Sequence, residues 1–227
     1  HSEIRNAIQA ARKEQESYRQ DLKEKTLSIL HEIQEKNLTG IVLAGRPYHL
    51  DPTVHHGIPD LINQLGMAVL SEDGISMLNK GMPNLRVLNQ WSYHNRLYKA
   101  ADFVTRHKNL ELVELNSFGC GLDAIVTDQV QEIMSQRNRL YTALKIDQGL
   151  NLGAVRIRLR SLKAAISNRT YGDGKVAPIM YSHPIYTPEM NAEYTILVPE
   201  MSPVHFPLLE AAGRASGYNP VSYTHLR

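Results

Sequence analysis

The N-terminal stretch of the chain carries apolar residues at helical spacing. Residues 3 to 37 are rich in Glu, Lys, Gln and Ala, and this pattern ends at Asn37 and Gly40. The apolar positions are Ile4, Ile8, Ala11, Tyr18, Leu22, Leu27, Leu30 and Ile33. Because a return every three or four residues is the repeat of one helix face, we predict a helical segment over residues 1–38, as one long helix or two.

After Gly40 the pattern changes to short apolar runs that alternate with amphipathic runs. The runs predict strands over residues 41–44, 67–70, 110–115 and 141–146, and helices over residues 58–65, 89–101, 123–136 and 152–167. Residues 74–85 predict an irregular loop. Alternation of this kind is typical of a parallel sheet covered by helices on both faces. We therefore predict a Rossmann-like, three-layer α/β lobe over residues 39–170, with a doubly wound, mostly parallel sheet.

The C-terminal part, residues 171–227, has a residue pattern that differs from that of the α/β lobe. Residues 171–193 contain a Gly/Asp break and several prolines with little periodicity, which indicates a linker. A strand over 194–198 and a helix over 205–215 predict the start of a following α/β region, residues 194–220. The tail, residues 221–227, resembles translated sequencing-adapter read-through, so we leave it out of the fold. With no initiator Met either, we expect the chain to be truncated at both ends.

The composition of the chain bears on its partners and on the compartment in which it works. The chain has 227 residues, of which 42% are hydrophobic and 21% charged, with a net charge of +2. This balance predicts no nucleic-acid partner and no membrane partner, and no apolar run is long enough to span a bilayer. A single cysteine excludes an internal disulfide framework and fits a reducing cytosol. We expect a cytoplasmic protein.

That single cysteine, Cys120, is the most informative residue. It stands between Gly119 and Gly121, where an apolar run ends and an amphipathic run begins. Glycines on both sides allow unusual backbone dihedrals and close approach to the sulfur. The N-terminal end of the following helix favours the thiolate, the form that ligates metal or attacks electrophiles. The alternative is a small residue packed in the core, and both interpretations stay open here.

Three predicted strands end in segments with unusual residues, namely 45–56, 119–123 and 147–153. In doubly wound sheets, ligands bind beyond the carboxyl ends of the strands. The candidate cleft-lining residues are Arg46, Tyr48, His49, Asp51, His55, His56, Asp123, Asp147 and Asn151.

The first of these segments offers two kinds of chemistry. Its three histidines and Asp51 supply atoms of the kind that bind metals, but they match no familiar ligand spacing. Arg46 and the helix that starts near Gly57 suit a phosphate or a carboxylate. The alternative is a structured loop whose histidines hydrogen-bond to the backbone. Asn151, similarly, suits a helix N-cap.

Four stretches taken together resemble one family. They are residues 40–49, 55–59, 116–123 and 144–160. The chain resembles, from about Ile4 to Arg169, the acyl-CoA dehydratase activase-related domain of large proteins from anaerobic bacteria. That family is akin to components of 2-hydroxyglutaryl-CoA dehydratase and benzoyl-CoA reductase.

No phosphate-binding loop, dinucleotide glycine fingerprint or nucleophile elbow is present in the sequence.

The resemblance implies one lobe of an iron–sulfur protein in ATP-dependent, low-potential electron transfer. Cys120 becomes the candidate ligand of a [4Fe–4S] cluster, with Gly119 and Gly121 giving clearance. Because such a cluster usually needs about four thiolates, the other cysteines are expected outside this chain, in an upstream lobe. The implied partners are that lobe and activase ATPase domains, and the chain alone is not expected to be active.

Two other functions remain open at this point. The chain is alternatively a non-catalytic docking lobe that orients the activase, with Cys120 merely packed. A third hypothesis is a small-molecule enzyme that uses His49, Asp51 and Cys120 without a cluster.

Overall fold

The computed structural model describes residues 2–119, 121–146, 152–169 and 186–223. The chain divides into two compact units, His1–Tyr181 and Ser182–Arg227, and each is described by itself. The division falls inside residues 171–193, for which the sequence predicts a linker. The predicted domain boundaries themselves stay predictions. In the described ranges, no helix has the length and apolar character of a membrane span.

The first unit is built on a four-stranded sheet in the order β2-β1-β3-β4. The strands are β1 (Gly40–Ala44), β2 (Ala68–Ser71), β3 (Leu110–Asn116) and β4 (Tyr141–Lys145). All three pairings are parallel, and β1 is the strand that pairs with both β2 and β3. The predicted parallel sheet is confirmed.

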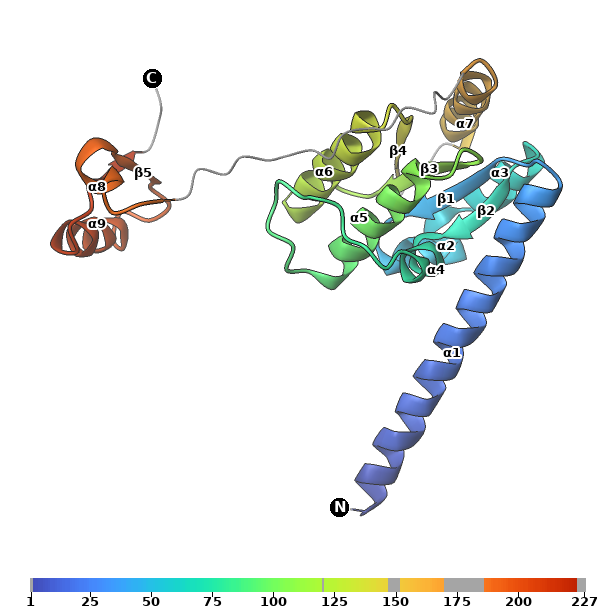
Figure 1. The fold of residues 1–227 in the computed structure, drawn as a ribbon, viewed down its shortest axis with the longest axis horizontal. Helices are drawn as coiled ribbons and strands as arrows, with labels where there is room; N and C mark the ends of the chain where they lie inside the picture. Colours follow the sequence, from blue (N-terminus) through green and yellow to red (C-terminus); the bar gives the residue numbers. More distant parts are fainter. Residues whose placement is uncertain (1, 120, 147–151, 170–185, 224–227) are drawn as a thin grey trace. The chain divides into compact units, whose positions relative to one another are not determined.

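Helices connect these strands and cover both faces of the sheet (Figure 1). They are α1 (Ser2–Glu35), the short 3-10 helix η1 (Pro47–Leu50), α2 (Pro52–His55), α3 (Ile58–Gln64), α4 (Glu72–Leu78), α5 (Ser92–Thr105), α6 (Leu122–Gln136) and α7 (Leu152–Ser167). The first helix is therefore one long helix and not two.

Alternating strand residues separate two hydrophobic cores. Val42 and Leu112 pack with the end of α1 and with α4, α5 and α6 on one face. Ile41 and Val113, their neighbours in sequence, pack with α3 and α7 on the other face. Successive side chains of a strand point to opposite faces, so strands that are apolar throughout must be covered on both sides. The three-layer, doubly wound prediction is confirmed.

The predicted loop over residues 74–85 is wrong at its start, because α4 runs from Glu72 to Leu78. Gly74 weakens the helix signal in the sequence. In the structure, however, its missing side chain lets α4 lie against α1. A Cβ built at Gly74 would be 2.2 Å from Thr26 Oγ1, and the neighbouring Ile75 is fully buried. Packing between helices outweighs local propensity here.

In the second unit, the described residues 186–223 form a parallel pair of strands and two helices. The elements are α8 (Met190–Glu193), β5 (Ile196–Pro199), α9 (Phe206–Ala215) and β6 (Pro220–Tyr223). Val221, Ser222 and Tyr223 pair with Leu197, Val198 and Pro199. These three tail residues, which the sequence analysis leaves out of the fold, therefore belong to a strand.

The contact of α1 with α4 gives a stability prediction. Gly74→Ala should lower the free energy of unfolding by about 1–3 kcal/mol, the usual cost of overpacking. The reason is that Thr26, whose hydroxyl donates to the Leu22 carbonyl at 2.7 Å, is a stiff neighbour. Urea unfolding measures the change.

Gly81→Ala is the matched control, because its Cβ would meet Asn79 Oδ1 at an ordinary 3.7 Å. Adding Thr26→Ala to Gly74→Ala should recover part of the loss. Equal effects of Gly74→Ala and Gly81→Ala would contradict the packing account.

Candidate functional site

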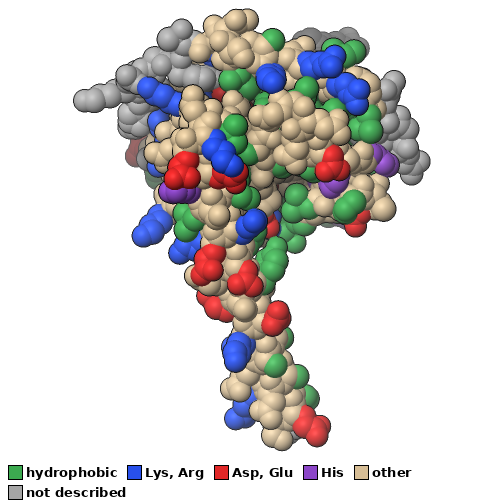
Figure 2. Space-filling view, turned by 90° about the vertical axis from the view of Figure 1, so that its right-hand side faces the viewer, with side chains coloured by type: hydrophobic (Ala, Val, Ile, Leu, Met, Phe, Trp, Pro, Cys, Tyr) green, Lys and Arg blue, Asp and Glu red, His purple; other side chains and the backbone are tan. Residues whose placement is uncertain are grey.

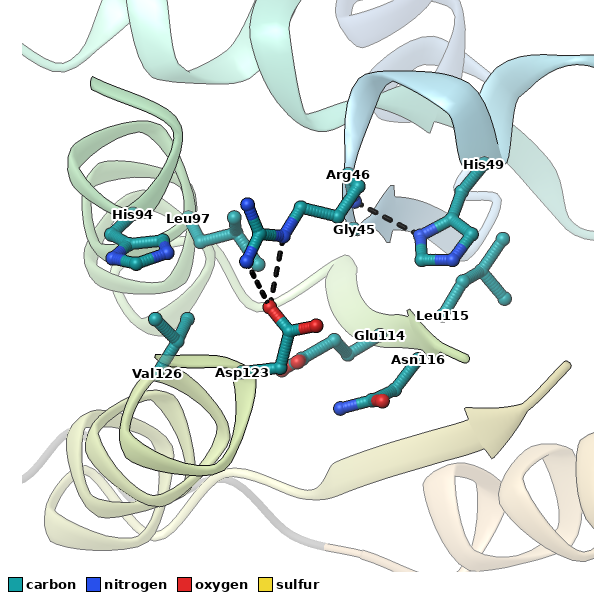
Figure 3. Close-up of a pocket in the computed structure, with 10 residues that line it drawn as sticks. All are labelled: Gly45, Arg46, His49, His94, Leu97, Glu114, Leu115, Asn116, Asp123 and Val126. Carbon is teal, nitrogen blue, oxygen red and sulfur yellow. Dashed lines mark hydrogen bonds and ion pairs between the residues drawn. The ribbon is translucent and has the colours of Figure 1, made fainter. Parts of the chain in front are cut away.

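The candidate site lies at the carboxyl ends of β1 and β3. After β1 the chain crosses to β2 on one side, and after β3 it crosses to β4 on the other. Such a reversal of strand order is where doubly wound sheets bind ligands. A cavity of about 10 Å³ lies at this point (Figure 3), room for about one water molecule. Its lining residues are Gly45, Arg46, His49, His94, Leu97, Glu114, Leu115, Asn116, Asp123 and Val126.

An ion pair joins the two sides of this crevice. Arg46 follows β1, and Asp123 lies in the first turn of α6. Arg46 Nε donates to Asp123 Oδ1 at 2.8 Å, and Arg46 Nη2 contacts the same oxygen. Both side chains are mostly shielded from solvent, at 28% and 22% exposure. The guanidinium that the sequence offers for anion binding is therefore already paired with a carboxylate.

His49 makes a second connection across the crevice. Its Nδ1 accepts a hydrogen bond from the Arg46 backbone N–H at 2.9 Å, and its Nε2 lies 2.9 Å from Ser117 Oγ. Since Nδ1 is an acceptor, the proton of the neutral ring is on Nε2, which donates to Ser117. Burial, aided by Arg46 and opposed by Asp123, lowers the pKa of His49. His49 thus links two loops as a neutral ring.

Gly45 makes this connection possible. A Cβ at this position would lie 2.5 Å from His49 Nδ1 and 2.8 Å from the Leu115 carbonyl oxygen. Only glycine therefore allows the ring to fold back onto the start of its own loop.

A buried carboxylate anchors the loop that follows β3. Glu114 accepts from Thr127 Oγ1 at 2.8 Å and from the Tyr141 hydroxyl at 2.9 Å. Asn116 Nδ2 donates to the same Thr127 oxygen, and Asn116 Oδ1 accepts from the Gly119 N–H at 2.7 Å. Burial raises the pKa of Glu114 and of Tyr141. A chain of hydrogen bonds thus runs from the core to Gly119.

The segment around Cys120 is only partly described, and Cys120 itself lies outside the described residues. Gly119 and Gly121 have φ of 64° and 57°, the left-handed conformations that glycine adopts readily. Gly121 is the N-cap of α6, and a Cβ there would meet none of the described residues within 4 Å, its chain neighbours apart. Phe118 is 76% exposed. The expected unusual dihedrals at both glycines are confirmed.

The remaining candidates of the first loop have local structural roles. Asp51 caps α2 by accepting from the Thr53 N–H at 2.8 Å, and hydrogen bonds from Thr53 lower the pKa of Asp51. His55 Nδ1 accepts from the Gly57 N–H at 3.1 Å. His56 has a left-handed φ of 50°. For His49 and His55, the interpretation as loop histidines bonded to the backbone is confirmed.

The structure does not gather these residues into a metal site. Within the described ranges, no group of three or more His, Cys, Asp or Glu residues could hold a metal ion. His49, Asp51, His55 and His56 are thus not brought together as ligands. Asp147 and Asn151 lie outside the described residues.

A larger hollow of about 610 Å³ lies at the same edge of the sheet. Residues from the loops after β1 and β3 and from the end of β4 form it: Tyr48, Thr53, Val54, His56, Ser117, Phe118 and Ile146. It brings the candidates Tyr48 and His56 next to Phe118, two positions before Cys120. Sequence reasoning missed Ser117 and Glu114. A glutamate inside the apolar run of β3 was the available signal for Glu114.

The first turn of α4, directly after β2, carries another buried carboxylate. Glu72 is 3% exposed, and both of its oxygens accept from Arg96 Nη2, at 2.6 and 2.9 Å. Burial outweighs the effect of Arg96 and raises the pKa of Glu72 to about 7.

Part of the chain is similar to a known protein family. Residues 1–75 match the family described as "CoA enzyme activase uncharacterised domain (DUF2229)". Those residues are similar to that family. The matched stretch includes α1, β1 and the Arg46–His56 loop. Residues 116–123 and 144–160, which also carry the resemblance seen in the sequence, lie beyond it. No curated protein and no solved structure matches the chain.

The Arg46–Asp123 ion pair gives a prediction. Arg46→Met should lower the free energy of unfolding by about 1.5–3 kcal/mol, because the shielded Asp123 carboxylate loses its charged donor. Arg46→Met combined with Asp123→Asn should cost less than the sum of the single changes. Urea unfolding of the four proteins measures the coupling.

Lys36→Met is the control, because it breaks the exposed Lys36–Glu32 pair and should change stability little. Additive effects of Arg46→Met and Asp123→Asn would contradict the proposed coupling.

Glu72 gives a prediction on pH. Its pKa is 4.5 when unfolded and about 7 when folded, so between these values the folded state holds a proton that the unfolded state has released. The resulting stabilisation is complete below pH 4.5 and is lost as the pH rises through 7. Glu72→Gln should therefore show a flatter decline in unfolding free energy across this window.

Urea unfolding at several pH values tests this. Glu16→Gln, at a carboxylate that is 81% exposed, is the control and should keep the slope of the parent chain. A slope unchanged by Glu72→Gln would show that Glu72 titrates normally.

Proposed function

We propose that this chain is one lobe of an iron–sulfur protein that works with a CoA enzyme activase. In this proposal Cys120 is the ligand from this lobe, and cysteines outside this chain complete a [4Fe–4S] cluster. The bound cluster would supply one-electron chemistry at low potential, accepting an electron that the activase gives up when it hydrolyses ATP. The electron would serve chemistry of the 2-hydroxyacyl-CoA dehydratase or benzoyl-CoA reductase type.

One observation carries the proposal. Gly119 and Gly121 flank Cys120 with left-handed dihedrals, at the N-terminus of the 15-residue helix α6. This end of a helix favours thiolate over thiol. The cavity between β1 and β3 holds about 10 Å³, too little for a cluster. In the proposal, ligands from another lobe therefore meet the cluster outside this cavity. Among the described residues, none but its chain neighbours comes within 4 Å of a Cβ built at Gly121.

The family match supports the activase connection and no finer statement. Residues 1–75 are similar to a domain of CoA enzyme activases, and the matched residues end before Cys120. The chain's own residues have a positioning role in the proposal. The hydrogen bonds from Glu114 through Thr127 and Asn116 to Gly119 hold the segment that leads to Cys120.

A second function is a docking lobe for the activase, with Cys120 structural. The observation that favours it is the Arg46–Asp123 ion pair, which closes the crevice where a ligand would otherwise bind. The third hypothesis, an enzyme that uses His49 and Asp51, gains no support, because both side chains are engaged in local hydrogen bonds.

The deciding experiment compares the parent protein with Cys120→Ser and Cys120→Ala. The complete polypeptide that carries this sequence is purified without oxygen, and its iron, acid-labile sulfide and low-temperature paramagnetic resonance spectrum are measured. We expect both variants to lose the cluster or change its spectrum while unfolding at the temperature of the parent.

Cys120→Ala serves as the structural control, because alanine keeps a small apolar side chain in place. Unchanged iron, sulfide and spectrum in both variants would overturn the iron–sulfur proposal and favour the docking lobe.

A further inference from the structure

The N-terminal two thirds of α1 carry a mostly apolar stripe that is exposed from Ile4 to Tyr18. Figure 2 shows α1 standing away from the rest of its unit. Ile4, Ile8 and Tyr18 are 62%, 48% and 57% exposed. The stripe consists of Ile4, Ile8, Ala11, Gln15, Tyr18 and Leu22. Steps that alternate between four and three residues are the a and d spacing of a coiled coil, so this stripe is shaped to pack against another helix.

The two edges of the stripe carry opposite charges. Arg5, Arg12 and Arg19 follow at intervals of seven residues along one edge, at the e positions. Glu14 and Asp21 follow at the same interval along the other edge, at the g positions. Charges at e and g set the partner and its orientation in coiled coils. The partner's edge that faces the three arginines must therefore be acidic.

A second copy of this chain does not fit. In an antiparallel pair the arginine edges would face each other, as would the acidic edges, which repels. In a parallel pair, the arginine edge of each copy would face the acidic edge of the other. However, α4 occupies part of the space that the second copy would need. Eighteen residues make about five turns, so Thr26 lies in line with Ile8. At Thr26 that line is covered by Gly74 of α4. A parallel copy would bring its own α4 into the same space.

The charges near the C-terminal end of the stripe, next to the part of α1 that α4 covers, indicate the direction in which the partner helix runs. A groove of about 510 Å³ lies between α1 and the α4–α5 pair, and its lining includes Tyr18, Arg19, Met77 and Lys99. The C-terminal end of a helix carries partial negative charge. A partner that runs parallel to α1 would place this end in the groove, near Arg19 and Lys99.

We propose that residues 4–22 of α1 are a docking surface for an amphipathic helix of another polypeptide segment, parallel to α1, with acidic residues along the edge that faces Arg5, Arg12 and Arg19. This surface is independent of the proposed cluster. The test uses two synthetic helices of about three heptads, with Leu along the seam and Gln at e. One has Glu at its g positions and the other has Lys there.

Fluorescence anisotropy measures the binding of each peptide to the protein, and sedimentation measures its oligomeric state. The Glu peptide should bind at least about tenfold more tightly than the Lys peptide, and the protein should remain monomeric. Equal binding, no binding, tighter binding of the Lys peptide, or dimerisation through α1 would overturn the proposal.

Two pairs of variants locate the surface. Ile8→Asp should abolish binding, and its control Gln9→Asp, one position away from the stripe, should not. Arg12→Glu should weaken the binding of the Glu peptide about fivefold. Lys13→Glu, which makes the same charge change on the opposite face of α1, should have little effect on this binding. All four positions are exposed, so folding should be unaffected. Equal losses within either pair would overturn the assignment.

Discussion

The Arg46–Asp123 ion pair is the contact on which the candidate site depends. It joins residues 77 positions apart and connects the loop after β1 to the first turn of α6. These two loops diverge at the reversal of strand order, where backbone hydrogen bonds of the sheet no longer hold them together. The ion pair and the His49–Ser117 hydrogen bond replace that connection with side chains. The ion pair holds the first turn of α6, and the hydrogen bonds from Glu114 through Thr127 and Asn116 hold Gly119.

The same contacts limit the chemistry of the crevice. Arg46, His49 and Asp123 are of the types that bind anions or transfer protons, but here they bind one another. The remaining cavity has room for about one water molecule. The larger hollow of about 610 Å³ lies outside the crevice, next to Phe118. This is why the proposed function uses a ligand shared with residues outside the chain and not an enclosed active site.

The layer structure could be predicted from the sequence because β1 is apolar throughout, β3 carries apolar residues on both of its faces, and both strands alternate with amphipathic helices. Buried strands of this kind require cover on both faces. The start of α4 could not be predicted, because its stability comes from contact with Thr26, which lies far away in sequence. The glycines beside Cys120 were informative for the same physical reason that they occur: few other residues adopt their dihedrals. The partners of Arg46 and His49 were not predictable, because each depends on how two distant loops meet.

The apolar positions of helix α1 are buried by the fold in its C-terminal part only. From Thr26 onward its inner face is buried against α4 and β2, and those residues need no other explanation. Before Leu22 the same face continues but is exposed, with charges of opposite sign along its two edges. A solvated helix would need neither the apolar stripe nor the sorting, so this part of the sequence reflects a contact beyond the described residues.

The central claim is that Cys120 ligates a cluster, and thiol protection tests it most directly. The complete polypeptide, purified without oxygen, is treated with iodoacetamide before and after its iron is removed by a chelator, and alkylation of Cys120 is quantified by mass spectrometry. The account predicts protection before iron removal and rapid alkylation afterwards. Equal alkylation of Cys120 in both samples, whether fast or absent, would contradict it.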